Sequence, residues 1–413
     1  MTRFSRARVA IAAAAALPLV LVAACSGSDG GTDGDGGGDG DVTELHVLDY
    51  YNNDPNKTVW QGVLDACAAE VGVELNRESV PGGDLIAKVL QMSSSRTLPD
   101  VLMLDNPDVQ QIAESGALAP LSQFGLDPGG IAEGVLSAST YEDELYALQP
   151  VTNTIALFYN TQVLADAGIE PPTTWEELET AAAALTEGDQ YGLALSAINT
   201  YEGTWQFLPF MWSNGGDEAD IATEEVAGAL QLWKDLLDSG SMSQSVVTWS
   251  QADVADQFSS GNAAMMVNGP WNFGTLAENA ELEYGIVPIP APAAGDTVVS
   301  PFGGEAWAVP QTGDDARMAV AAEFVQCLVG EDAVVDAAVG TNTVPTDPSL
   351  SAAVVEQVPN LASFAEQVPD LRARTGELGP EWPTQATAIY EAVQNALVGG
   401  MSPEDALAQA QNG

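Results

Sequence analysis

Short apolar, strand-like stretches alternate with stretches of helical periodicity along most of the chain. The segment 99–105, PDVLMLD, is almost continuously apolar, which is typical of a strand covered on both faces, and helical spacing follows over 109–116. Further predicted strands are 45–51, 73–80, 153–160, 191–197, 264–271, 284–290 and 306–310. Further predicted helices are 55–72, 83–96, 173–187, 223–240, 314–330, 382–400 and 402–413. Strands that alternate with helices in this way predict βαβ units and a parallel sheet.

The patterned part of the chain is long enough for two domain-sized cores, since it runs for about 370 residues. We therefore expect an α/β fold of two doubly wound lobes joined by a hinge. Such sheets bind ligands at the carboxyl ends of their strands, so a cleft between the lobes is the expected ligand site. The segment 204–216 is rich in aromatic residues and ends in Gly215-Gly216, and its first tryptophan, Trp205, is expected at a strand end or in a loop.

The first 41 residues differ from the rest in composition. Three arginines precede an apolar run that ends at Ala24, the pattern of a secretory signal peptide over 1–24. Small residues before Cys25 resemble a bacterial lipobox, which implies cleavage before Cys25 and a lipid anchor on its thiol. An ordinary cleaved signal with an incidental cysteine is the alternative. Residues 25–41 are, after Cys25, only Ser, Gly, Asp and Thr, which predicts a flexible acidic tether.

The charge balance narrows the range of partners. Three of the 11 basic residues precede Cys25 and all 59 acidic residues follow it, so the mature chain would carry a formal charge of −51. Such a chain repels nucleic acid, and it has few cations with which to hold an anionic ligand. The two remaining cysteines, Cys67 and Cys327, lie in apolar helical contexts. Outside the cytoplasm a disulfide is permitted, and their spacing leaves a disulfide and two buried thiols equally open.

Several ordered segments resemble the sugar-binding group of bacterial extracellular solute-binding proteins, the maltose-binding-protein type that serves ABC importers. They are LPDVLMLD to ESGALAPL (98–121), LYALQPVTNTIALFYNTQVLADAGIEPPTTWEEL (145–178), FSSGNAAMMVNGPW (258–271), SPFGGEAWAVP (300–310) and SPEDALAQAQ (402–411). The resemblance implies a periplasmic-binding-protein fold of type II. It also implies capture of a mono- or oligosaccharide for a membrane permease, at the cell surface on the outer face of the cytoplasmic membrane. We expect a monomer without a cofactor or metal.

The resemblance implies three crossings between the lobes, near 149–153, 288–300 and 341–345. Lobe 1 would then comprise 42–150 and 290–342. Lobe 2 would comprise 151–289 and 343–413.

Tryptophans at strand ends or in loops are the first candidates for a sugar site, because an aromatic face covers the C–H patch of a sugar ring. These candidates are Trp205, Trp249 and Trp271. Packing in the core is the ordinary role of a tryptophan in a large protein, and we expect it of Trp60, Trp175, Trp212, Trp233 and Trp307. The resemblance places a stacking aromatic at Trp271, directly after a strand that Asn268-Gly269-Pro270 stops, and another at Trp205. Trp249 is balanced between the two roles.

Polar and small residues at strand ends and crossings complete the predicted site. They are Tyr51, Asn52, Asp105, Asn153, Gly303, Gly304 and Glu305. Planar polar groups suit sugar hydroxyls, and glycine lets a ligand approach the backbone. Each has a plainer alternative: a helix cap for Asp105, a turn for the glycines and solvation for Glu305. Arg372 and Arg374 are more readily explained as partners of the many acids than as ligand contacts.

Two other classes of function are alternatives to a receptor. Catalysis by a Ser-His or Cys-His pair is poorly supported, since the single histidine, His46, lies inside the first predicted strand, and no phosphate-binding or zinc motif occurs. We predict no catalytic residues, although two carboxylates alone serve a glycosidase. A receptor for a cationic ligand such as a polyamine is the stronger alternative, because tryptophan and carboxylates together attract cations.

Overall fold

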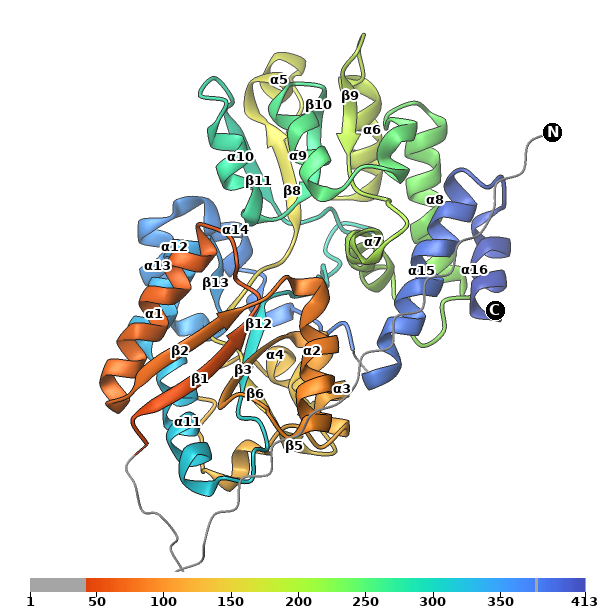
Figure 1. Ribbon diagram of the computed structural model, residues 1–413. Helices are drawn as coiled ribbons and strands as arrows, with labels where there is room; N and C mark the ends of the chain where they lie inside the picture. Colours follow the sequence, from red (N-terminus) through yellow and green to blue (C-terminus); the bar gives the residue numbers. More distant parts are fainter. Residues whose placement is uncertain (1–41, 376–377, 413) are drawn as a thin grey trace, which may run out of the picture. The chain divides into compact units, whose positions relative to one another are not determined.

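The computed structural model describes residues 42–375 and 378–412, and the predicted signal peptide (1–24), the predicted lipidation site Cys25 and the predicted tether (25–41) lie outside them. The first of its two main sheets has the strand order β2-β1-β3-β12-β6 (Figure 1). Its strands are β1 (Glu44–Asp49), β2 (Glu74–Ser79), β3 (Val101–Asp105), β6 (Ala147–Leu148) and β12 (Glu305–Ala308). β1 runs parallel to β2 and β3, whereas β12 runs antiparallel to β3 and β6.

Helices cover both faces of the first sheet. They are α1 (Asn56–Val71), α2 (Gly82–Ser95), α3 (Val109–Glu114), α4 (Glu133–Ala138), α11 (Asp315–Leu328) and α12 (Glu331–Thr341). Along β3, Val101 and Met103 belong to the cluster that contains α1 and α11, whereas Leu102 and Leu104 belong to the cluster of α2 and α3. This alternation explains the continuous apolar run of the strand, because successive side chains point to opposite, equally covered faces.

The second main sheet has the order β11-β8-β10-β9. Its strands are β8 (Ala156–Asn160), β9 (Tyr191–Ala194), β10 (Ala263–Asn268) and β11 (Tyr284–Val287). The helices that surround this sheet are α5 (Thr161–Ala167), α6 (Trp175–Leu185), α7 (Tyr201–Ser213), α8 (Glu224–Asp238), α9 (Gln251–Ser259), α10 (Phe273–Ala277), α15 (Trp382–Leu397) and α16 (Pro403–Gln411). One face packs with α6, α7, α8 and α15, and the other with α9 and α10.

Shorter elements connect these parts. The helices are α13 (Ser351–Gln357) and α14 (Ala362–Ala365), and the strands are β4 (Thr140–Tyr141), β5 (Glu144–Leu145), β7 (Val151–Thr152) and β13 (Val344–Pro345). The 3-10 turns are η1 (Asn106–Asp108), η2 (Leu121–Gln123), η3 (Gln244–Val247), η4 (Pro270–Asn272), η5 (Pro348–Leu350), η6 (Pro359–Leu361), η7 (Val368–Asp370) and η8 (Gly379–Glu381). β7 pairs antiparallel with β13, so two segments expected at lobe crossings lie together. The division into lobes at the predicted residues stays a prediction.

Two features differ from the sequence prediction. Both main sheets are mixed rather than parallel, because β12 and β8 run antiparallel to their neighbours. Local alternation cannot show this for β12, which joins the first sheet only after a long excursion of the chain. Residues 204–213 of the aromatic-rich segment belong to a helix, α7, despite Pro209. Within α7, residues 203–212 are all buried. Burial on every side removes the amphipathic period by which a helix is recognised.

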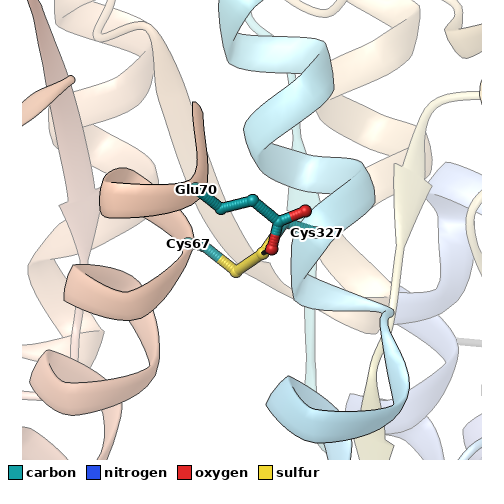
Figure 2. The surroundings of a disulfide bond; sticks show 3 residues. All are labelled: Cys67, Glu70 and Cys327. Carbon is teal, nitrogen blue, oxygen red and sulfur yellow. Dashed lines mark hydrogen bonds between the residues drawn. A yellow bond between two sulfur atoms is a disulfide. The ribbon is translucent and has the colours of Figure 1, made fainter. Parts of the chain in front are cut away.

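The chain forms one disulfide among its described residues, between Cys67 and Cys327. Cys67 lies on α1 and Cys327 near the end of α11, 260 residues further along the chain (Figure 2). The carboxylate of Glu70 lies 3.5 Å from the Cys327 sulfur. The bond thus joins two helices on the same face of the first sheet, and it answers the question that the sequence leaves open. Among the described residues, no helix combines the length and the apolar character needed to cross a membrane.

Candidate functional site

A cavity of about 330 Å³ collects most of the predicted site residues. Of the ten predicted ligand-binding residues, seven line it: Asp105, Asn153, Trp205, Trp271, Gly303, Gly304 and Glu305. Five further residues complete the lining: Tyr50, Tyr201, Glu202, Gln251 and Arg374. Strand ends, helix N-termini and segments that were predicted to cross between the lobes therefore converge here, as expected for a ligand site in an α/β fold.

Trp271 is held on the cavity by the turn that ends β10. The Asn268 side chain accepts from Gly269 N at 3.0 Å and donates to Gln251 O at 2.8 Å, which ties the turn to the start of α9. The indole then lies on Gly269, since a Cβ at that position would meet the ring at 2.1 Å. With 38% of its surface exposed, Trp271 is not a core residue. The Asn-Gly-Pro-Trp sequence builds a flat apolar wall at the edge of the cavity.

Gly269→Ala should displace the Trp271 ring and weaken ligand binding about tenfold while leaving the fold intact. The backbone at Gly269 has φ −118°, which any residue adopts, so the added methyl group acts only by collision with the indole. The matched control is Gly274→Ala in α10, where a Cβ meets nothing within 4 Å. Calorimetric titration of both variants checks the effect. Equal affinities would show that the ring position is irrelevant to binding.

Trp205 reaches the cavity from the second turn of α7, not from the strand end or loop that the sequence predicts. Thr200 caps this helix through Glu202 N. The buried Gln206 side chain accepts from Ser196 N and donates to Val267 O, so it fastens α7 to the ends of β9 and β10. Trp205 is 8% exposed. The helix therefore presents a small exposed part of this indole to the cavity.

Two carboxylates lie opposite each other on the first sheet, because Asp105 of β3 and Glu305 of β12 are register partners. Like charges in this arrangement repel. The Glu305 carboxylate accepts from both the Tyr50 and the Tyr51 hydroxyl. Burial raises the pKa of Glu305, while these two hydroxyl donors act in the opposite direction. Burial and the Glu305 charge raise the pKa values of Tyr50 and Tyr51 well above the usual range, so both hydroxyls stay protonated.

Arg374 is the only cation that lines the cavity within the described part of the chain. Its Nη2 atom donates to Asp105 Oδ1 at 2.9 Å and to Asn106 Oδ1 at 3.3 Å. Its guanidinium carbon lies 4.8 Å from the centre of the Trp205 ring. The expectation that this arginine pairs with an acid is confirmed, and the acid is itself a predicted site residue.

Gly303 and Gly304 lie so close to residues 149–153 that a side chain at either position would collide with them. A Cβ on Gly303 would lie 2.3 Å from Asn153 Oδ1, and Gly304 has φ +97°. Gly303 N donates to Asn153 O at 2.8 Å, and Gly303 O accepts from Gln149 and Thr152. The two glycines therefore let residues 149–153 pack closely against them, and they also line the cavity.

Three predicted site residues lie outside the lining. Tyr51 is buried and stacks on Trp60, and only its hydroxyl reaches toward the site, through Glu305. Asn52 accepts from its neighbour Asn53. Trp249 is half-buried against the hydrophobic clusters, and its carbonyl accepts from Ser196. Tyr50, beside Tyr51, is the tyrosine that lines the cavity.

The lining residues that the sequence analysis did not propose stand mainly at helix starts. Tyr201 and Glu202 begin α7, and Gln251 begins α9. The two starts are joined, since Gln251 N donates to Glu202 Oε2 at 2.9 Å. The capping residues Thr200 and Ser250 mark these starts in the sequence. No sequence pattern shows that the two starts meet.

A family model described as bacterial extracellular solute-binding protein matches residues 62–363, which is most of the chain. The chain belongs to the bacterial extracellular solute-binding protein family. The family resemblance noted in the sequence is thus confirmed, and with it the α/β fold of two lobes.

Three known proteins illustrate how similar this solute-binding protein is to its relatives. A putative binding protein of Brucella abortus (strain 2308) is 28% identical over 240 residues, which are 55% of this chain and 58% of that protein. The match thus spans less than two thirds of that relative's length. A maltooligosaccharide ABC transporter solute-binding lipoprotein of Streptococcus pneumoniae (strain R6) is 21% identical over 88% of both chains. The crystal structure of a cyclic alpha-maltosyl-1,6-maltose binding protein from Arthrobacter globiformis covers 90% of this chain and 97% of its own, with 27% identity and a TM-score of 0.78.

Proposed function

We propose that this protein is the solute-binding component of an ABC importer and that it captures an oligosaccharide in the described cavity. The observation that carries the proposal is the pairing of two indoles, Trp271 and Trp205, with the carboxylates of Asp105 and Glu305 around one cavity. The names of the relatives that bind maltooligosaccharides support it.

The chemistry of the cavity suits a sugar. Flat C–H faces of a pyranose ring pack on an indole, and the hydroxyls at its rim donate to carboxylate oxygens. A site with a large apolar surface and a few fixed polar groups gives both affinity and orientation. Because the Glu305 oxygens are already held by two tyrosine hydroxyls, the acceptors are in place before a ligand arrives, which lowers the entropy lost on binding.

Trp271→Ala should weaken saccharide binding about 30-fold, since it removes about 2 kcal/mol of apolar burial. The midpoint of thermal unfolding should stay within about 2 °C of wild type, because the ring lies at the surface. Titration calorimetry against a panel of mono- and oligosaccharides measures the first effect, and circular dichroism the second. Trp271→Phe, which keeps a flat ring, should recover part of the affinity. A wild-type protein that binds no saccharide of the panel would overturn the proposal.

A cationic ligand such as a polyamine is the second candidate. Among the residues that the structure describes, three carboxylates, from Asp105, Glu202 and Glu305, line the cavity against one cation, Arg374. A polyamine panel in the same calorimeter separates the two candidates, because binding of a cation weakens steeply with added salt, whereas binding of a neutral sugar changes little.

The cellular setting belongs to the same proposal. We propose a monomer that is tethered by a lipid on Cys25 to the outer face of the membrane, that delivers its ligand to permease subunits, and that has no catalytic activity. The family description and the lipoprotein relative support this setting. Globomycin-sensitive processing of the precursor and mass spectrometry of the mature N-terminus test the anchor, and incubation with labelled oligosaccharides tests the absence of turnover.

A further inference from the structure

Arg374 contacts two groups of the candidate site at once. It pairs with the Asp105 carboxylate, which comes from the end of β3 in the first sheet. It also stacks on Trp205, which comes from α7 and packs with the second sheet. The guanidinium group is planar and rigid, and it combines hydrogen bonding at its edge with stacking on its face. With only 14% of its side chain exposed, Arg374 has little freedom to leave this position.

We propose that Arg374 is a positioning residue: it fixes the Asp105 carboxylate and the Trp205 ring in the arrangement that the saccharide meets. The inference rests on the proposed function and extends it, because it assigns the geometry of the two ligand-facing groups to one side chain. Asp105 and Arg374 are 269 residues apart in the sequence, so this geometry depends on how the chain segments come together.

The charges around Arg374 show why a cation is needed there. Asp105 and Glu305 are opposite residues of an antiparallel pair, and Asp108 follows in η1. The Arg374 charge favours ionisation of both Glu305 and Asp108. Without it, nothing in this group would offset the repulsion between the Asp105 and Glu305 carboxylates, and Asp105 would lose the hydrogen bond from Arg374 Nη2.

The chain contains its own control for this role. Arg372, two residues earlier, makes the same kinds of contact. It donates to Asp217 at 2.7 Å and to Glu218 at 2.9 Å, and its guanidinium carbon lies 4.8 Å from the centre of the Trp212 ring. Arg372 does not line the cavity, whereas Arg374 does. A merely structural arginine in this segment should therefore behave like Arg372.

The first test needs no ligand. In NMR spectra of the indole N–H groups, Arg374→Gln should shift the Trp205 resonance and leave that of Trp212 in place, and Arg372→Gln should do the reverse. Trp205→Phe and Trp212→Phe assign the two resonances. A Trp205 resonance that stays unmoved in Arg374→Gln would overturn the inference.

The second test measures affinity for the saccharides that the wild type binds. Arg374→Gln should weaken binding about 30-fold, the scale of a lost charge-assisted hydrogen bond, and Arg372→Gln less than about threefold. Arg374→Lys keeps the charge without the planar stack, so it should fall between wild type and Arg374→Gln. Equal losses in the two glutamine variants, or none in Arg374→Gln, would contradict a positioning role. Absence of any saccharide binding by the wild type would instead overturn the proposed function, while the indole shift would still support the positioning.

Discussion

Replacing both Cys67 and Cys327 by alanine should lower the free energy of unfolding by about 4 kcal/mol. The bond closes a loop of 260 residues, and a cross-link restricts the unfolded chain more as the loop grows. For a folded part of about 370 residues, the loss corresponds to a fall of about 5 °C in the unfolding midpoint. Alanine is preferred to serine because Cys67 is buried. A serine hydroxyl at that position would add its own desolvation penalty.

Dithiothreitol provides the matched control for this prediction. It should lower the midpoint of the wild type by the same amount and leave the alanine variant unchanged. Ligand affinity should stay within about twofold in both cases, since neither cysteine lines the cavity. A wild-type midpoint that does not respond to the reductant would show that the two thiols are not bonded.

Local sequence patterns account well for the individual elements. The helix predicted over 173–187 forms as α6, and Thr174 caps it in a capping box with Glu177. The apolar run of β3 is covered on both faces, as its composition requires. Such features depend on neighbours within a few residues, so a sequence displays them directly.

Contacts between segments that lie far apart in the chain could not be predicted from the sequence. Placing β12 between β3 and β6 brings Glu305 opposite Asp105, and nothing within either strand indicates that partner. The local sequence also does not show which of Tyr50 and Tyr51 lines the cavity. Both residues follow β1, and both hydroxyls donate to Glu305. Glycines are clearer local signals, because a side chain at Gly269, Gly303 or Gly304 would collide with neighbouring protein atoms. The site residues could be proposed singly, but not their mutual geometry.

Asp108→Asn should stabilise the protein at pH 8 by up to about 4 kcal/mol and have little effect at pH 3. Burial, with a smaller contribution from the Asp105 charge, raises the pKa of Asp108 from 3.8 to about 7 in the folded protein, although Arg374 opposes the rise. Below pH 3.8 both the folded and the unfolded states hold the proton. Between pH 3.8 and 7 the unfolded state releases it first, so the unfolded state becomes relatively more stable as the pH rises. Above pH 7 the whole penalty is present, and asparagine removes it.

The difference in unfolding free energy between wild type and Asp108→Asn, measured by urea titration at intervals from pH 3 to 8, should therefore grow across this window and level off above pH 7. Asp253→Asn is the control of opposite sign. Hydrogen bonds from Ser250 lower the pKa of Asp253 in its capping box, so its ionised form stabilises the folded state, and this variant should be destabilised at neutral pH and approach wild type as the pH falls below 3.8. A flat difference curve for Asp108→Asn would mean that the folded protein binds no extra proton there, and the cluster of Asp105, Asp108 and Arg374 would then accommodate two full negative charges beside one cation.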